Sequence, residues 1–320
     1  MNMSRTLATY VPIYVVSKSR SEFMMTSRAL TNMSVAHHVI VEDSQEEAYS
    51  RSVHEKKLQT KILVLPQHYK NVYELCDLHG LSKSTGAGPA RNFAWAHSTE
   101  GGHKGHWVMD DNIRGFQRLH NNLKLDVKSP AVFTIMEEYA RRYKNLAMVG
   151  PQYDYFVPRK MKTPPITLNT RIFSCNLIRN SIEKRWRGRY NEDLILSLDL
   201  LYAGWCTALF SIFLQQKTPT QMMKGGNTEE LYKATRLPDA PATTHYAVGG
   251  TDAKTQMILD IYPKITKAVF RYGRAHHAVQ FRQFKKRNLI PCSEYRPIDP
   301  SIYEMKLVPK KTRIAEATND

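Results

Sequence analysis

The chain has little of what defines several common protein classes. Its four cysteines among 320 residues show neither Cys-x-x-Cys nor Cys/His ligand spacing, so we expect reduced thiols in a reducing compartment. No apolar run is long enough to cross a bilayer, and no apolar segment of signal-peptide length follows the N-terminus, so we expect a cytoplasmic protein with no membrane partner. No internal repeat is present, and the near-average composition excludes collagen-like, coiled-coil and wholly disordered chains.

Acidic residues are also scarce. Asp and Glu total 29 against 46 Lys and Arg, which leaves a formal net charge of +17. This balance favours a polyanionic partner such as nucleic acid, or a phosphorylated substrate. Basic residues gather in two stretches, 155–190 and 261–293, which predict a binding surface that includes Arg185, Arg187, Arg271, Arg274, Lys285, Lys286 and Arg287. The alternative is that both stretches are solvated faces of helices or loops.

Short apolar runs typical of strands recur along the chain with helical patterns between them. They lie at residues 9–16, 38–41, 61–65, 106–109, 145–149, 171–178 and 206–214. This alternation predicts an α/β fold with a mainly parallel sheet flanked by helices. We expect residues 1–220 to form this domain, residues 221–308 to form a basic, helical C-terminal part packed on it, and residues 309–320 to be a mobile tail.

Two carboxylates and an amide, Asp110, Asp111 and Asn112, follow the apolar run 106–109. Ligands bind at the carboxyl ends of parallel strands, and carboxylates there commonly hold Mg²⁺ or Mn²⁺ together with substrate phosphates. The pattern therefore indicates a metal site, and an Asp-Asp-Asn turn that caps the next segment is the alternative.

Two further motifs have both a structural and a functional interpretation. A Gly-rich turn precedes a helix that begins near Pro89, where free amides and Arg91 would bind a pyrophosphate, unless the segment is only a loop and a helix start. Glu192 and Asp193 begin a Leu-rich helix, where the helix dipole favours acids even without a function. A carboxylate at such a position beside a crevice is also placed to act as a general base.

The order of these motifs resembles that of GT-A glycosyltransferases. The segments Gly88-Pro-Ala-Arg-Asn92, Trp107-Val-Met-Asp-Asp-Asn-Ile113, Tyr190-Asn-Glu-Asp193, Gly225-Gly-Asn-Thr228 and Arg271-Tyr-Gly-Arg-Ala-His-His277 resemble the TET-associated glycosyltransferases of phages, to which the kinetoplastid base J glucosyltransferase is similar. The resemblance spans residues 9–290. It implies a GT-A (Rossmann-like) fold with a basic C-terminal extension, and transfer of a hexose or pentose to a hydroxymethylated pyrimidine in DNA, in the host-cell cytoplasm.

The resemblance also implies roles for single residues. Ser17, Arg20, Glu42, Asp43 and Asp110 would bind a nucleotide sugar, expected to be a UDP-sugar, and Arg91 its diphosphate. Asp110, Asp111 and Asn112, with His277 as a late ligand, would hold Mn²⁺ or Mg²⁺. Asp193, or Glu192 beside it, would be the catalytic base of an inverting reaction, with a retaining reaction as the alternative, and the basic surface would contact the DNA acceptor.

Three rival functions remain open from the sequence. A nucleotidyltransferase would also hold metal and nucleotide on paired acids, although it usually needs a further acid close by. A glycosyltransferase that acts on polysaccharide or protein would share every donor motif. A catalytically inactive GT-A domain would bind DNA alone, which the intact acids of both motifs argue against.

Overall fold

The computed structural model describes residues 9–77, 84–158, 164–218, 223–226, 230–231, 250–271 and 274–296. Over this part of the chain, strands and helices alternate, as the sequence predicts. They are β1 (Ile13–Val16), α1 (Met25–Asn32), β2 (His37–Val41), α2 (Glu46–Glu55), β3 (Thr60–Val64), α3 (Gln67–Asn71), α4 (Gly88–Glu100), β4 (Gly105–Asp110), β5 (Ile113–His120), β6 (Leu123–Asp126), α5 (Ala131–Arg141), β7 (Leu146–Tyr153), β8 (Ile166–Leu168), β9 (Cys175–Arg179), α6 (Glu192–Tyr202), β10 (Cys206–Lys217), α7 (Gly250–Ile261), β11 (Thr266–Arg271) and β12 (Arg274–Val279).

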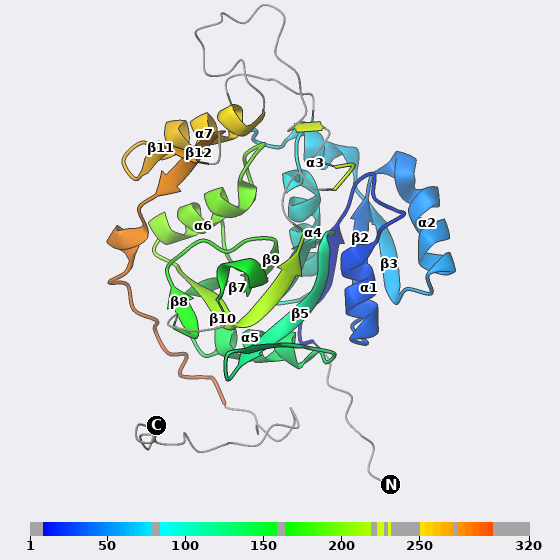
Figure 1. Cartoon of the computed structure of the whole chain (residues 1–320), viewed down its shortest axis with the longest axis horizontal. Helices are drawn as coiled ribbons and strands as arrows, with labels where there is room; N and C mark the ends of the chain where they lie inside the picture. The colour runs from blue at the N-terminus through cyan, green and yellow to red at the C-terminus, as the bar shows by residue number, and fades with distance from the viewer. Residues whose placement is uncertain are drawn as a thin grey trace, which may run out of the picture.

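A single ten-stranded sheet forms the centre of the molecule (Figure 1). Its order is β3-β2-β1-β4-β9-β7-β10-β5-β6, with β8 paired to β10. The pairings give β1, β2, β3, β4, β6, β7 and β10 one common direction, whereas β5, β8 and β9 run the opposite way. The predicted mostly parallel α/β sheet is therefore confirmed, while β5, β6 and β8 are strands that the sequence analysis did not predict.

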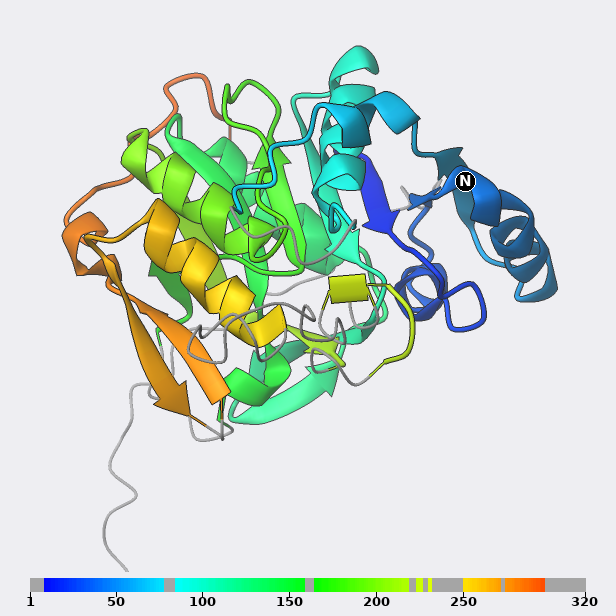
Figure 2. The same ribbon diagram turned by 90° about the horizontal axis from the view of Figure 1, so that it is seen from above.

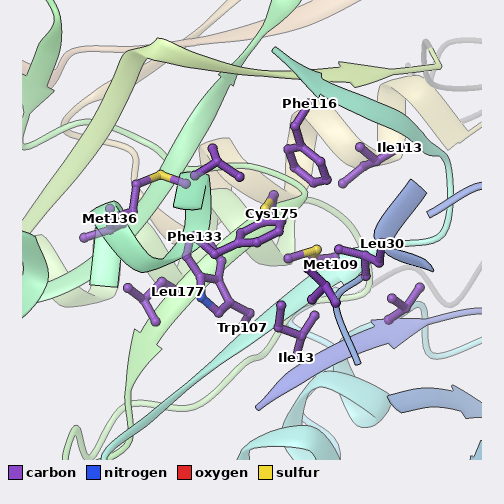
Figure 3. Close-up of a cluster of buried hydrophobic side chains, with 14 of the residues drawn as sticks. Ile13, Leu30, Trp107, Met109, Ile113, Phe116, Phe133, Met136, Cys175 and Leu177 are labelled. Carbon is purple, nitrogen blue, oxygen red and sulfur yellow. The ribbon is translucent and has the colours of Figure 1, made fainter. Parts of the chain in front are cut away.

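Helices cover both faces of the sheet because strand residues alternate between two cores. On one face, Trp107 and Met109 of β4 pack with Phe133 of α5 and Leu30 of α1. Figure 3 shows this cluster, in which the thiol of Cys175 lies among the rings. Val108, between Trp107 and Met109, instead belongs to the core under α4 and α6. All four cysteines are free thiols, as expected.

Helix α6 is buried on two sides, which explains its nearly uniform run of leucines. Leu196 and Leu200 face the sheet core, whereas Leu194, Leu198 and Leu201 pack against α7 and the segment after β12. In Figures 1 and 2, α6, α7 and the β11–β12 hairpin are stacked in this order away from the sheet. The C-terminal part therefore packs on the main domain through α6.

The secondary structure of this C-terminal part differs from the prediction. Among the described residues of the part expected to be helical, 221–308, the helix α7 is followed by an antiparallel hairpin in which Thr266 pairs with Val279. Val269 and Phe270 are strand-forming residues, and this local preference prevails over the expected helix. Residues 309–320, predicted to be a mobile tail, lie outside the described residues. Within the described residues, no helix has the length and apolarity that a membrane span requires.

The double burial of α6 generates a stability prediction. Leu198→Ala removes a side chain that is fully buried between α6 and α7, so we expect the free energy of unfolding to fall by about 2–5 kcal/mol. Val72→Ala is the control, because Val72 is 78% exposed and should change stability by less than about 0.5 kcal/mol. Urea denaturation of both variants measures the difference, and equal midpoints would contradict the assigned packing.

Candidate active site

A cleft of about 480 Å³ opens at the carboxyl edge of the sheet. Six of the seven strands that share a direction, all except β6, contribute the end of the strand or a residue just beyond it, namely Ser17, Glu42, Leu65, Asp110, Tyr153 and Lys217. The start of α6 and residues 275–277 of β12 complete the wall. This is where open α/β sheets bind ligands, so the topology alone assigns a binding function to this edge.

Most of the residues that the sequence singled out meet in this cleft. Those that line it are Ser17, Arg20, Glu42, Asp110, Asp111, Asn112, Glu192, Asp193 and His277. Asp43 does not, because it begins a short 3-10 turn and its side chain is exposed. Arg91 also does not line the cleft, since its guanidinium lies beneath the floor with 1% of the residue exposed.

The paired acids at the end of β4 are surrounded by hydrogen-bond donors. Arg91 Nη2 and Lys217 Nζ each lie 2.5 Å from one oxygen of Asp110. Arg20 Nη1 lies 2.7 Å from Asp111 Oδ1, and Ser17 Oγ donates to Asp111 Oδ2 at 2.8 Å. Burial alone would raise the pKa of Asp110, but the charges of Lys217 and Arg91 hold it well below its usual range. Asp110 is therefore ionised, within a compact cluster of opposite charges.

The Arg91 guanidinium joins this strand end to α6. Besides Asp110, it contacts Asp193 Oδ1 at 3.2 Å through Nη1 and Glu192 Oε1 at 3.4 Å through Nε. The ring of Trp186 lies 4.7 Å from its carbon Cζ. Burial opposes the charge of Arg91, but the three carboxylates outweigh burial and raise its pKa. Arg91 is placed to hold the acids in position rather than to meet a diphosphate, which corrects the role expected from the sequence.

The motif around Arg91 has a structural explanation. Gly88 begins α4 where a Cβ atom would lie only 1.7 Å from the Tyr73 hydroxyl, so no side chain fits there. Pro89 favours the first turn of the helix. Asn92 then fixes the neighbouring loop, because its amide donates to the carbonyl of Trp186 and its oxygen accepts from the Trp186 N–H. Together these contacts set the position of Arg91.

The two acids at the start of α6 have different surroundings. Asp193 is tied down, because its two oxygens accept from the Ser174 N–H and the Asn176 amide, both at 3.0 Å. Glu192 has the 3.4 Å contact with Arg91 and faces the cleft. Burial, reinforced by Asp193 and Asp110 and opposed by Arg91, raises the pKa of Glu192 to about 7. A carboxylate that titrates near neutrality and faces a cleft is suited to proton transfer.

Three of the residues predicted for nucleotide binding, Ser17, Arg20 and Glu42, make further contacts on the β1–β2 side of the cleft. Tyr49 hydrogen-bonds to Ser17, which donates to Asp111. Arg20 donates to the carbonyls of Lys224 and Gly225 as well as to Asp111. Glu42 forms ion pairs with Lys70 and Lys18. These contacts fix the side chains before any ligand arrives.

The predicted metal ligands are a poor fit for Mn²⁺ or Mg²⁺. A hard cation needs several oxygen ligands with accessible lone pairs. All four carboxylate oxygens of Asp110 and Asp111 already face hydrogen-bond donors. The two donors on Asp110 belong to cationic side chains, and each lies 2.5 Å from its oxygen. Asn112 Oδ1 has no hydrogen-bond partner among the residues that the structure describes, but it is a single buried neutral oxygen. His277 lies on β12, where burial, Lys254 and Arg171 lower its pKa to about 3. Within the described ranges, no three His, Cys, Asp or Glu side chains gather as a metal site.

Two of the predicted DNA-contacting residues have partners within the fold. The guanidinium of Arg187 is bound to Asp199 and Glu74, and that of Arg287 donates to the carbonyls of Leu201 and Trp205 at the end of α6. Lys285 and Lys286 are exposed and lie near the C-terminal end of α6. The cleft is at the other end of this helix, which is about 16 Å long. Arg185 covers the ring of Trp95, Arg271 is exposed on β11, and the side chain of Arg274 lies outside the described residues.

Sequence reasoning missed two features of the cleft. Lys217 is the first, because the predicted strand stops at residue 214 whereas β10 continues to Lys217. The second is an aromatic group in which Tyr153 stacks on Tyr155, with ring centroids 5.1 Å apart, beside Phe156 and Phe173. Tyr155 and Phe156 are 50% and 55% exposed. The signal in the sequence was the group of aromatic residues, Tyr153, Tyr155 and Phe156, soon after the apolar run 145–149.

Comparison with known proteins gives a family and a distant structural likeness. A sequence model of the family described as TET-Associated Glycosyltransferase matches residues 11–226. No curated protein matches the chain. Among solved structures, the apo crystal structure of mouse xyloside xylosyltransferase 1 is similar at 8% identity and a TM-score of 0.34, over 59% of this chain and 71% of that one.

The Arg91 cluster generates the second prediction. Arg91→Met would leave Asp110, Glu192 and Asp193 buried without their shared cation, so we expect the free energy of unfolding to fall by about 3–5 kcal/mol. Arg91→Lys should cost less, although an ammonium cannot span three carboxylates as a guanidinium does. The control is Arg185→Met, which removes an exposed cation over Trp95 and should cost about 1 kcal/mol or less. Equal thermal stability of Arg91→Met and the wild type would contradict this assignment.

Proposed function

The chain belongs to the TET-associated glycosyltransferase family, since the family match covers more than half of it, and on this premise we propose that it transfers a sugar from a nucleotide sugar to a hydroxymethylated pyrimidine in DNA, with inversion at the sugar. That the chain is a glycosyltransferase follows from the family. The observation that carries the proposal is the meeting, in one cleft, of the β1–β2 strand ends, the β4 acids and the α6 acids.

The donor would occupy the cleft from the β1–β2 side to its centre. Ser17, Arg20 and Glu42 line that side and are held by internal contacts, which supports a rigid site for the nucleotide. Lys217 lies at the centre beside Asp110, close to where the diphosphate would lie. The nucleotide is proposed to be a uridine diphosphate sugar.

Glu192 is proposed as the catalytic base. In a direct displacement, the acceptor hydroxyl gives its proton to the base while its oxygen bonds to the anomeric carbon. The bond from that carbon to the diphosphate oxygen breaks, and the electron pair leaves with the diphosphate. Asp193, the first choice from sequence, accepts fixed hydrogen bonds on both oxygens and would position Arg91 and Glu192 instead.

A nucleobase acceptor is supported by the aromatic group beside the cleft. Phe156 and Phe173 line the cleft, and the half-exposed rings of Tyr155 and Phe156 offer faces on which a base can stack. Arg171, whose guanidinium lies 5.2 Å from the Phe173 ring, adds a cation at the same place. The net charge of +17 supports a polyanionic acceptor independently of the family.

The base assignment predicts a pH dependence. A general base acts in its ionised form, so we expect kcat to rise with pH through an apparent pKa of about 7 and to be lost below it. Glu192→Gln should remove this limb and lower kcat by about 10²- to 10⁴-fold, with donor affinity unchanged. Glu183→Gln, an exposed acid nearby in sequence, is the control. If Asp193→Asn removes the limb and Glu192→Gln does not, Asp193 is the base.

The acceptor is tested by mass spectrometry of nucleosides from DNA. Duplexes that contain hydroxymethylcytosine or hydroxymethyluracil are incubated with the protein and a panel of nucleotide sugars, with and without Mn²⁺. We expect a hexose or pentose increment on the hydroxymethylated base and none on unmodified DNA. Transfer to polysaccharide or protein but not to DNA would favour that rival function, whereas DNA binding without transfer from any donor would favour an inactive domain.

A further inference from the structure

Lys217 occupies a position beside Asp110, one of the acids that fit a divalent cation poorly. This residue ends β10, and its side chain reaches the centre of the cleft with 9% exposed. The pairing of β10 with β5 shifts register between Gln215 and Lys217, and such a bulge re-aims the side chains beside it. Lys217 Nζ lies 2.5 Å from both Asp110 Oδ2 and Ser174 Oγ. The ammonium of Lys217 is therefore built into the place where the sequence predicted a metal, and of the two cations on Asp110 it is the one that lines the cleft.

We propose that Lys217 contacts the diphosphate of the donor and supplies the positive charge expected of a metal, so that transfer needs no divalent cation. An ammonium has three N–H donors, and in the described part of the chain Asp110 and Ser174 are the hydrogen-bond acceptors of two of them. The third is available to a ligand in the cleft that Lys217 lines.

The surrounding groups hold this ammonium in place. Asp110 accepts from Lys217 on one side and from Arg91 on the other, so the carboxylate is fixed before the donor binds. Ser174 precedes β9 and also hydrogen-bonds to Tyr153, whose ring lies 5.7 Å from Lys217 Nζ. A preorganised cation near the departing phosphate stabilises the negative charge that develops as the bond to the sugar breaks. A divalent cation on Asp110 would first have to displace Lys217.

This inference rests on the proposed nucleotide-sugar donor, and diphosphate binding tests it separately from transfer to DNA. Calorimetry with UDP, GDP and dTDP is performed on the wild type in EDTA and in Mn²⁺. We expect one of these diphosphates to bind with the same affinity, within about twofold, in both buffers. Electron paramagnetic resonance measures free Mn²⁺ in the presence of that diphosphate, with and without the wild-type protein. We expect the protein to leave the concentration of free Mn²⁺ unchanged, because only the nucleotide binds the ion.

Two variants and a control isolate the side chain. Lys217→Ala should weaken diphosphate binding by about 10- to 100-fold, as expected for the loss of one charge-assisted hydrogen bond, and Lys217→Arg should retain part of the affinity. Lys104→Ala is the matched control, because Lys104 is exposed at the opposite end of β4 from Asp110. Circular dichroism checks that each variant folds, and if Lys217→Ala does not fold, Lys217→Arg and the wild-type measurements still decide.

The outcomes separate the two proposals. Diphosphate affinity that is lost in EDTA and restored by Mn²⁺ would overturn the role of Lys217. Diphosphate affinity that Lys217→Ala leaves unchanged would do the same. Either result would leave the proposed donor class intact. A wild type that binds none of the diphosphates would contradict both the donor and the inference. Lysine-dependent binding together with no transfer to DNA would support the inference and contradict only the acceptor.

Discussion

One guanidinium, that of Arg91, holds the catalytic region together. It is buried, and it contacts carboxylates from two elements that are far apart in sequence, Asp110 at the end of β4 and the Glu192–Asp193 pair at the start of α6. Without this cation, three buried negative charges would repel one another across the junction of strand and helix. The spacing of the acids in the cleft therefore depends on an interaction that lies below the cleft and is closed to solvent.

The same cluster explains how a cleft lined by acids can serve a negatively charged substrate. Arg91 and Lys217 neutralise Asp110, and Arg20 neutralises Asp111, so the strand-end acids act as fixed anchors for cations. A cation anchored in this way does not have to reorganise when charge moves onto a leaving group. Glu192 is held less tightly, because its contact with Arg91 is longer, and its pKa is raised to about 7. Lys217 and Glu192 thus lie on either side of the Asp110–Arg91 pair, in keeping with the separate roles proposed for them in diphosphate binding and proton transfer.

The sequence predicted the parts of the fold that local pattern controls. The apolar runs became β1, β2, β3, β4, β7, β9 and β10, and the strand-end acids and the acids of α6 do line one cleft. What could not be predicted depends on pairing between distant segments. The antiparallel insertion of β9, the bulge that directs Lys217 and the burial of Arg91 beneath the floor arise from register and packing. Nor does the sequence show that the side chains of Arg187 and Arg287 have partners within the fold, because Asp199 and the carbonyl of Leu201 reach them only through tertiary packing.

The burial of α6 on two sides bears on where this protein can be divided. The region that matches the family ends at residue 226, yet Leu194, Leu198 and Leu201 are covered by residues that come after it, including Met257 and Ile258 of α7. A chain cut at that boundary would present a leucine stripe to water on the helix that carries Glu192 and Asp193. The core that supports these two acids thus continues past the family boundary, through α7 and on to Phe284 beyond the β11–β12 hairpin.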